Sequence, residues 1–157
     1  MRRYMIGLCL LLIGCVSYNR HDPALEASYD PTAQGNVYQE LMLTTGVTTP
    51  NPIIRGETVI IWLAVKNLSR ETVHRCSSTT CTWQFRVWNA DGALVDVHPA
   101  GGFFQKTCLS FPPEEVVVLE FDCQYEDLPS GKYKVVGGLG CQVETAQTAP
   151  PVWVELF

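Results

Sequence analysis

The stretch that decides the fold is EEVVVLEFDCQYEDLPSGKYKVVGGLG, residues 114–140. Its first part, 114–125, alternates apolar Leu119 and Phe121 with acidic Glu120. Alternation of apolar and polar residues with a period of two is typical of a β-strand that is buried on one face. The stretch therefore predicts a long strand, followed by a turn and a second strand.

The turn between these two strands is LPSGKY, residues 128–133. A leucine, a proline and a glycine turn precede Tyr133, which enters the second strand. This is the arrangement of a tyrosine corner, in which the hydroxyl bonds to backbone a few residues upstream and fixes one crossing between two sheets. The alternative is that Tyr133 is simply a core aromatic residue on an alternating strand.

The same period of two recurs along the chain from Val37 onwards. In 57–67 both faces are apolar, which predicts a central strand that is covered on both sides. Strands at regular intervals, with turn residues between them and no helical period, predict an all-β fold, an antiparallel immunoglobulin-like β-sandwich of about seven strands. The predicted strands are 37–45, 57–67, 81–89, 93–97, 114–125, 132–140 and 150–157.

The first residues predict export and lipidation. Arg2 and Arg3 precede an apolar run that ends at Gly14; the run is too short to span a bilayer, which needs about 20 residues. The segment LIGC, residues 12–15, resembles a bacterial lipobox, in which the cysteine thiol is acylated and the signal peptidase cuts the bond before it. We therefore expect cleavage between Gly14 and Cys15, with Cys15 as the lipid-anchored first residue. A plain secretory signal is the alternative.

This interpretation divides the chain into three parts. We expect a lipoprotein signal peptide over 1–14, an acylated cysteine with a flexible tether over 15–36, and the sandwich domain over 37–157. Lipidation places the protein in the bacterial cell envelope. In a Gram-negative host Val16 favours the outer membrane, because the aspartate that retains lipoproteins in the inner membrane is absent at this position.

The charge of the chain argues against nucleic acid as a partner. Sixteen Asp and Glu against eleven Lys and Arg give a net charge of −5, and loss of Arg2 and Arg3 with the signal peptide takes it to −7. Binding to phosphates depends on clusters of lysine and arginine, and the sequence shows none. The expected partners are the membrane, through the lipid on Cys15, and a protein of the envelope.

The cysteines of the exported domain are expected to form disulfides, because the compartment outside the cytoplasm is oxidising. The favoured bridge is Cys76–Cys81, across the short loop CSSTTC. Cys108 is expected to pair with Cys123 or Cys141, and the odd thiol is expected to be buried.

The segment HRCSSTTC, residues 74–81, also allows a metal site. His74, Cys76 and Cys81 lie close together in the sequence, and Cys108 could be the fourth ligand of a tetrahedral zinc site. The spacing matches no established zinc pattern and exported thiols tend to be oxidised. We therefore expect no metal and no other cofactor.

The sequence contains no recognisable catalytic motif: no nucleophile elbow, zincin helix or phosphate-binding loop is visible. Asp96 and His98 are two apart on one predicted strand face and could form an acid–base pair. A solvated turn histidine is the interpretation that the sequence favours. We expect that the protein is not an enzyme.

The chain from about Ile61 to Leu139 resembles the intracellular proteinase inhibitor domain of the BsuPI type. The resemblance implies a sandwich fold and, as a function, the binding and inhibition of a protease. The features that carry it, in order, are LAVKNLS (63–69), WQFRVWNADG (83–92), ALVDV (93–97), FFQ (103–105), FPPEE (111–115) and LPSGKYKVVGGL (128–139).

Loops on a rigid sandwich commonly carry recognition, so the loops 98–104 and 76–81 are the expected contact points for a partner. The expected function is that of a lipid-anchored module that binds a protein, in one version a protease inhibitor. A structural accessory lipoprotein of an envelope complex is the alternative. The candidate contact residues are His98, Phe103, Phe104 and Trp88.

Several aromatic residues fall on strand faces opposite the predicted core. They are either covered by a second apolar layer or form an exposed patch of the kind that anchors a protein partner. These residues are Trp62, Trp88, Trp153 and Phe157.

Overall fold

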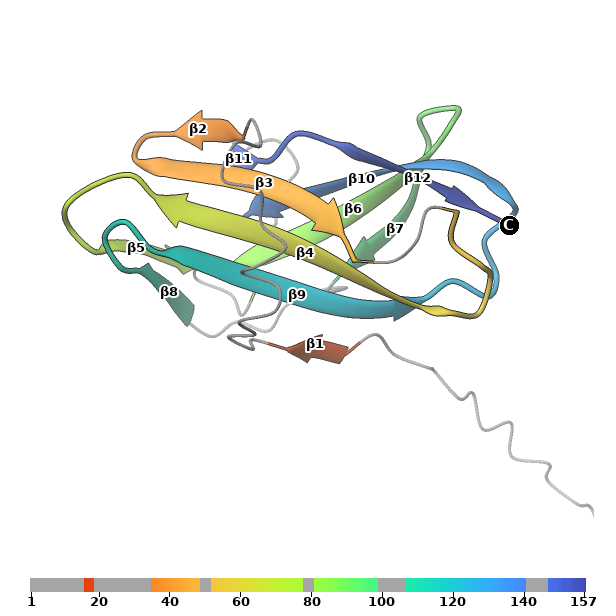
Figure 1. Cartoon of the computed structure of the whole chain (residues 1–157), viewed down its shortest axis with the longest axis horizontal. Coiled ribbons are helices and arrows are strands. Elements are labelled where there is room, and N and C mark those ends of the chain that lie inside the picture. The colour runs from red at the N-terminus through yellow and green to blue at the C-terminus, as the bar shows by residue number, and fades with distance from the viewer. Residues whose placement is uncertain (1–15, 19–34, 49–51, 78–80, 99–106, 141–146) are drawn as a thin grey trace, which may run out of the picture.

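The computed structural model of the chain is a two-layered β-sandwich (Figure 1). The structure describes residues 16–18, 35–48, 52–77, 81–98, 107–140 and 147–157. The strands are β1 (Val16–Tyr18), β2 (Asn36–Tyr38), β3 (Leu41–Val47), β4 (Thr58–Asn67), β5 (Val73–Ser77), β6 (Trp83–Asn89), β7 (Leu94–His98), β8 (Thr107–Phe111), β9 (Val116–Gln124), β10 (Gly131–Leu139), β11 (Gln147–Thr148) and β12 (Val152–Leu156).

Two sheets and a ribbon make up the fold. The first sheet has the order β1-β9-β4-β3-β2, and the second has the order β11-β10-β6-β7, with β12 also paired to β10. Strands β5 and β8 form a separate two-stranded ribbon at one end (Figure 1). All strand pairs within these sheets are antiparallel. The predicted immunoglobulin-like sandwich is confirmed.

The predicted strands are all present, with one division. The segment predicted as one strand over 37–45 is split into β2 and β3 by a turn at Gln39, whose φ of 58° lies in the left-handed region. Strands β1, β5, β8 and β11 were not predicted.

The core lies between the two sheets and is filled by the alternating positions that the sequence indicates. On β4, Ile61 and Leu63 are fully buried, and on β6 Phe85 lies opposite them with Val87 beside it. The outer face of β4 is also partly covered, since Ala64 is buried against Val118 in a small second cluster. The prediction of a central strand covered on both sides is therefore confirmed.

The tyrosine corner is confirmed by a hydrogen bond. Tyr133, near the start of β10, donates from its hydroxyl to the carbonyl oxygen of Pro129 at 2.6 Å. Its ring is buried in the core, so the bond ties the chain segment that crosses between the sheets to the first turn of β10.

A second tie between the sheets lies at Gly137 of β10. Its backbone N–H donates to Oγ1 of Thr45 on β3 at 2.8 Å. A Cβ at this position would stand 2.9 Å from the ring of Phe85, so only glycine permits the close approach.

Asn67 closes the turn after β4 from inside the protein. It is fully buried, and its Nδ2 donates to the carbonyl oxygens of Glu71 and Phe111, both at 2.8 Å. Its Oδ1 accepts from the backbone N–H of Ser69 at 2.9 Å. These bonds attach the turn to the end of β8 and satisfy backbone groups that water cannot reach.

The beginning of the expected tether is part of the sandwich. Residues 16–18 form β1, which pairs with β9 in the register Val16↔Asp122. The prediction of a flexible tether over 15–36 is therefore wrong for these residues, because the exposed edge of β9 offers backbone hydrogen bonds that a short segment of any composition can use.

The disulfide differs from the expected pairing. Cys76 is bonded to Cys108, its direct partner in the β5–β8 register, so the predicted Cys76–Cys81 bridge is wrong. Cys81 is also disulfide-bonded, to a partner that lies outside the described residues. Cys123, expected as a bridging candidate, is the buried free thiol.

Candidate binding face

Three side chains form a row across the outer face of the second sheet. The register pairs Lys134 of β10 with Trp88 of β6 on one side and with Trp153 of β12 on the other. Their neighbours along the strands, Val87 and Val135, fill the core, so the row points away from it. The ammonium of Lys134 lies 4.7 Å from the ring centroid of Trp88, a cation–π contact.

The row continues into an exposed apolar strip along β12. Trp153 is 55% exposed and Phe157 is 59% exposed. Ile54, also exposed, lies beside Phe157, because the segment 53–55 runs parallel to the end of β12 and the N–H of Arg55 donates to the carbonyl oxygen of Phe157. We call Trp88, Lys134, Trp153 and Phe157 the aromatic face.

Trp62 does not belong to this face. It lies on β4 of the first sheet, where its ring covers Gly46 of β3 so closely that a Cβ there would stand 1.9 Å from the indole. Of the four aromatic residues predicted to lie opposite the core, one is therefore a half-buried covering residue, and the other three lie together on the second sheet.

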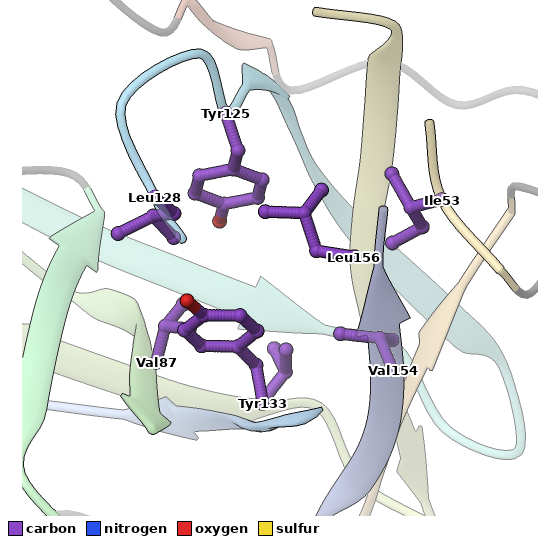
Figure 2. A pocket seen from close by; sticks show the side chains of 8 residues that line it. Ile53, Val87, Tyr125, Leu128, Tyr133, Val154 and Leu156 are labelled. Atoms are coloured by element: carbon purple, nitrogen blue, oxygen red, sulfur yellow. The ribbon is translucent and has the colours of Figure 1, made fainter. Parts of the chain in front are cut away.

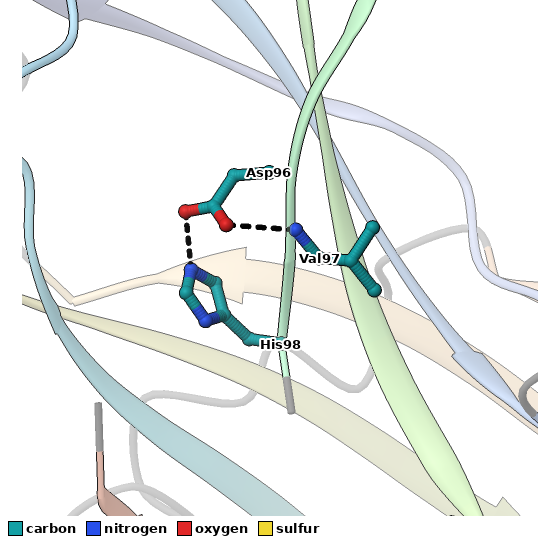
Figure 3. A network of polar contacts seen from close by, with 3 residues as sticks. All are labelled: Asp96, Val97 and His98. Atoms are coloured by element: carbon teal, nitrogen blue, oxygen red, sulfur yellow. Dashed lines mark hydrogen bonds and ion pairs between the residues drawn. The ribbon is translucent and has the colours of Figure 1, made fainter. Parts of the chain in front are cut away.

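His98 occupies a packed position at the edge of the core rather than a solvated turn. Its side chain is 13% exposed and stacks on Phe121 of β9, with ring centroids 4.8 Å apart. Figure 3 shows its Nε2 joined to Oδ2 of Asp96, while Oδ1 of Asp96 accepts from the N–H of Val97 at 2.8 Å. The structure thus brings Asp96 and His98 together, but it turns His98 inward, where it offers a partner little surface.

The other loop candidates lie outside the described residues. These are Phe103 and Phe104, together with Gly14 and Cys15 of the expected lipidation site. Among the residues that the structure describes, there is no helix long and apolar enough to cross a bilayer.

The segment considered for zinc is arranged differently from a metal site. The bond between Cys76 and Cys108 consumes two of the four expected ligands. His74 makes a hydrogen bond to Oγ of Ser110 across the β5–β8 ribbon at 2.9 Å. Its position on the ribbon therefore reflects strand pairing.

A small apolar cavity lies between the sheets near the tyrosine corner (Figure 2). The rings of Tyr125 and Tyr133 face one another across it, and Val154 and Leu156 of β12 close one side. The cavity belongs to the core and brings no charged group to a ligand. Its lining residues are Ile53, Val87, Tyr125, Leu128, Tyr133, Val135, Val154 and Leu156.

Sequence reasoning missed one residue of this region, Arg86 on β6. The sequence places it on the outer face of an alternating strand, as the structure does, but exposure of a charged residue would be the ordinary expectation. In the structure Arg86 is only 4% exposed. An arginine inside the otherwise aromatic and apolar run WQFRVW, residues 83–88, is the signal that could have drawn attention to it.

Comparisons with known proteins show the fold. No known family matches the sequence, and no curated protein is similar to it. The C-terminal domain of Wzt superposes with a TM-score of 0.54 at 12% identity, over 82% of this chain and 80% of that one. The DNA glycosylase AlkC of Pseudomonas fluorescens gives 0.51 at 13% identity, over 74% of this chain but only 30% of the glycosylase.

A CARDB domain from Pyrococcus furiosus also resembles the chain, with a TM-score of 0.47 and 18% identity over 82% of this chain and 98% of the domain. At these identities the chain shares an immunoglobulin-like β-sandwich with structures of unlike kinds, and the fold is what they have in common.

Proposed function

We propose that this protein is a lipid-anchored module of the bacterial cell envelope that binds another protein through the aromatic face. The anchor is the lipid on Cys15, and the proposed location in a Gram-negative host is the outer membrane. The proposed role is binding and not catalysis. The observation that carries the proposal is the row Trp88–Lys134–Trp153 with Phe157, which leaves two large aromatic side chains more than half exposed.

Protein interfaces explain this composition better than chance exposure does. Aromatic residues and arginine are enriched at interface hot spots, and a tryptophan that packs against a partner contributes more than other residue types. Contiguous apolar surface of this kind on a soluble body favours association. The row is also preorganised, because Lys134 holds the Trp88 ring in place.

The resemblance to BsuPI-type inhibitors supports a protease as one version of the partner. A panel of serine proteases titrated with the protein tests this version, and stoichiometric loss of activity of one protease is the expected result. Failure against every protease would remove inhibition and leave binding of an envelope protein, including the accessory role in an envelope complex, to the next experiment.

Site-specific photo-crosslinking in living cells tests the binding face. A benzoylphenylalanine in place of Trp153 is expected to crosslink the full chain to a specific protein, and Trp88→Ala in the same chain is expected to abolish the product. The same photo-reactive residue in place of Leu68, which is 49% exposed in the turn after β4, is the control. Equal products at both positions, or none at Trp153, would contradict the proposal.

A further inference from the structure

Arg86 is a buried cation without a counter-ion. It points to the outer face of β6, since its neighbours Phe85 and Val87 are in the core. Its Nε donates to Oε1 of Gln84 at 2.9 Å, whereas its Nη2 is buried and has no hydrogen-bond partner in the part of the chain that the structure describes. Burial lowers the pKa of Arg86 from its ordinary value, because desolvation disfavours the charged form.

This arrangement is costly for the isolated protein. A buried charged group normally has an ion pair and a full set of hydrogen bonds, because its lost hydration is not otherwise offset. Here the residues in register on either side of Arg86 are Val97 of β7 and Val136 of β10, which can supply no carboxylate. The site therefore has free donor capacity at the level of the sheet.

The aromatic face surrounds this donor with positive charge. Lys132 and Lys134 of β10 lie on the same outer face, and Glu155 of β12 is the carboxylate paired in register with Lys132. Among the described strand residues of this face, three cations thus stand against one carboxylate, in a chain whose net charge is −5. Charge complementarity favours an acidic partner segment.

We propose that Arg86 is the recognition site for a carboxylate of the partner protein, supplied by an acidic segment that lies across the aromatic face between Trp88 and Trp153. The inference rests on the proposed function and names the chemistry of its partner. The planar guanidinium matches a carboxylate in two parallel hydrogen bonds. The indoles on either side would pack on apolar groups next to that carboxylate and exclude water from the pair.

Burial of Arg86 has a kinetic consequence. A carboxylate can reach Nη2 only after the side chains above it move aside, and association that requires such a change is slower than the usual rate for docked patches. Slow association with slow dissociation is therefore the expected signature of this contact.

Titration of the full chain in detergent micelles tests the carboxylate site. The probe is an end-capped hexaglutamate peptide, with a hexaglutamine peptide as the uncharged match, and the readout is the side-chain Nε–H resonance of Arg86, assigned by its absence in Arg86→Lys. Hexaglutamate is expected to shift this resonance, and hexaglutamine to leave it unchanged. No shift with hexaglutamate would overturn the proposal.

Substitutions supply the second measurement. Arg86→Met and Arg86→Lys are each expected to weaken hexaglutamate binding about 10- to 100-fold, since the first removes the charge and the second removes the fork. Lys66→Met, on the outer face of the first sheet, is the control and is expected to bind as the parent does. Retention of parental affinity in a folded Arg86→Met protein would overturn the proposal.

Two outcomes separate this inference from its neighbours. Binding of a trigalacturonate through Arg86 without binding of hexaglutamate would overturn the protein carboxylate and assign the site to an acidic glycan. Persistence of the Trp153 crosslink in cells that carry Arg86→Met would overturn the role of Arg86 while the proposed binding face stands. Loss of that crosslink together with the weaker hexaglutamate binding is the expected result.

Discussion

At the scale of single residues, the stability of this sandwich depends on a few polar groups whose partners are inside the protein. Asn67 and Tyr133 each bind a backbone carbonyl that lies away from bulk water, at the two ends of the core. Such bonds are modest when made and expensive when one partner is removed. Arg86 is the opposite case, a buried donor whose partner is missing from the described part of the chain.

Tyr133→Phe is expected to lower the free energy of unfolding by about 1–2 kcal/mol, because the carbonyl of Pro129 loses the hydroxyl that donates to it. Urea denaturation followed by tryptophan fluorescence measures the change. Tyr38→Phe is the matched control: Tyr38 is half-buried at the rim of the core, and its hydroxyl makes no hydrogen bond within the described residues. A loss at Tyr38 as large as that at Tyr133 would contradict the tyrosine corner.

Removal of the buried charge is expected to stabilise the protein. Gln84→Leu combined with Arg86→Met replaces both partners of the hydrogen bond with apolar groups and removes the desolvated cation, which should raise the free energy of unfolding by about 1–2 kcal/mol. Arg86→Met alone leaves Oε1 of Gln84 unsatisfied and should be close to neutral. Thermal unfolding of both variants and of Lys66→Met measures the effect, and a destabilised double variant would show that Arg86 serves the fold.

At the scale of elements, alternation in the sequence was enough to predict the strands of both sheets but not the ribbon. Strands such as β4 and β9 contribute long apolar faces to the core, so their pattern is visible in the sequence. Strands β5 and β8 lie outside the two sheets and alternate half-buried with exposed residues. Their pairing, and with it the Cys76–Cys108 bond, depends on a register that no local pattern contains.

The double variant Cys76→Ser/Cys108→Ser is expected to lower the free energy of unfolding by about 3–4 kcal/mol, since the bond closes a segment with a sequence separation of 32. Peptide mapping of the oxidised parent should recover the two cysteines in one linked fragment, and urea denaturation gives the energy. Cys123→Ala, at the buried free thiol, is the control, with an expected loss of about 1 kcal/mol. A Cys76–Cys81 fragment in the map would contradict the pairing.

The candidate site was only partly accessible from the sequence for a related reason. Trp88, Trp153 and Phe157 could be assigned to outward positions from alternation alone. Their assembly into one face requires the β6-β10-β12 order, which joins strands far apart in the chain. The burial of Arg86 and the inward turn of His98 depend on packing by other elements, so a single strand gives no sign of either.

At the scale of the whole molecule, the amino terminus is expected to determine where the protein works. Cys15→Ala is expected to leave the chain at its full length and without acyl groups, whereas the parent begins at an acylated Cys15. Intact mass spectrometry after labelling with an alkyne fatty acid distinguishes the two forms. Cys9→Ala, within the expected signal peptide, is the control and should be processed normally. Acylation that persists in Cys15→Ala would contradict the lipobox.

The pairing of β1 with β9 gives that lipid a mechanical meaning. Because β1 begins one residue after Cys15, acyl chains there would be separated from the folded body by a single peptide link instead of a long leash. The sandwich would then ride at a fixed height and tilt over the bilayer, with the β9 edge nearest the headgroups. A ligand would have to come to that height, and the search for it would be confined to a thin layer above the lipid, where its effective concentration is raised.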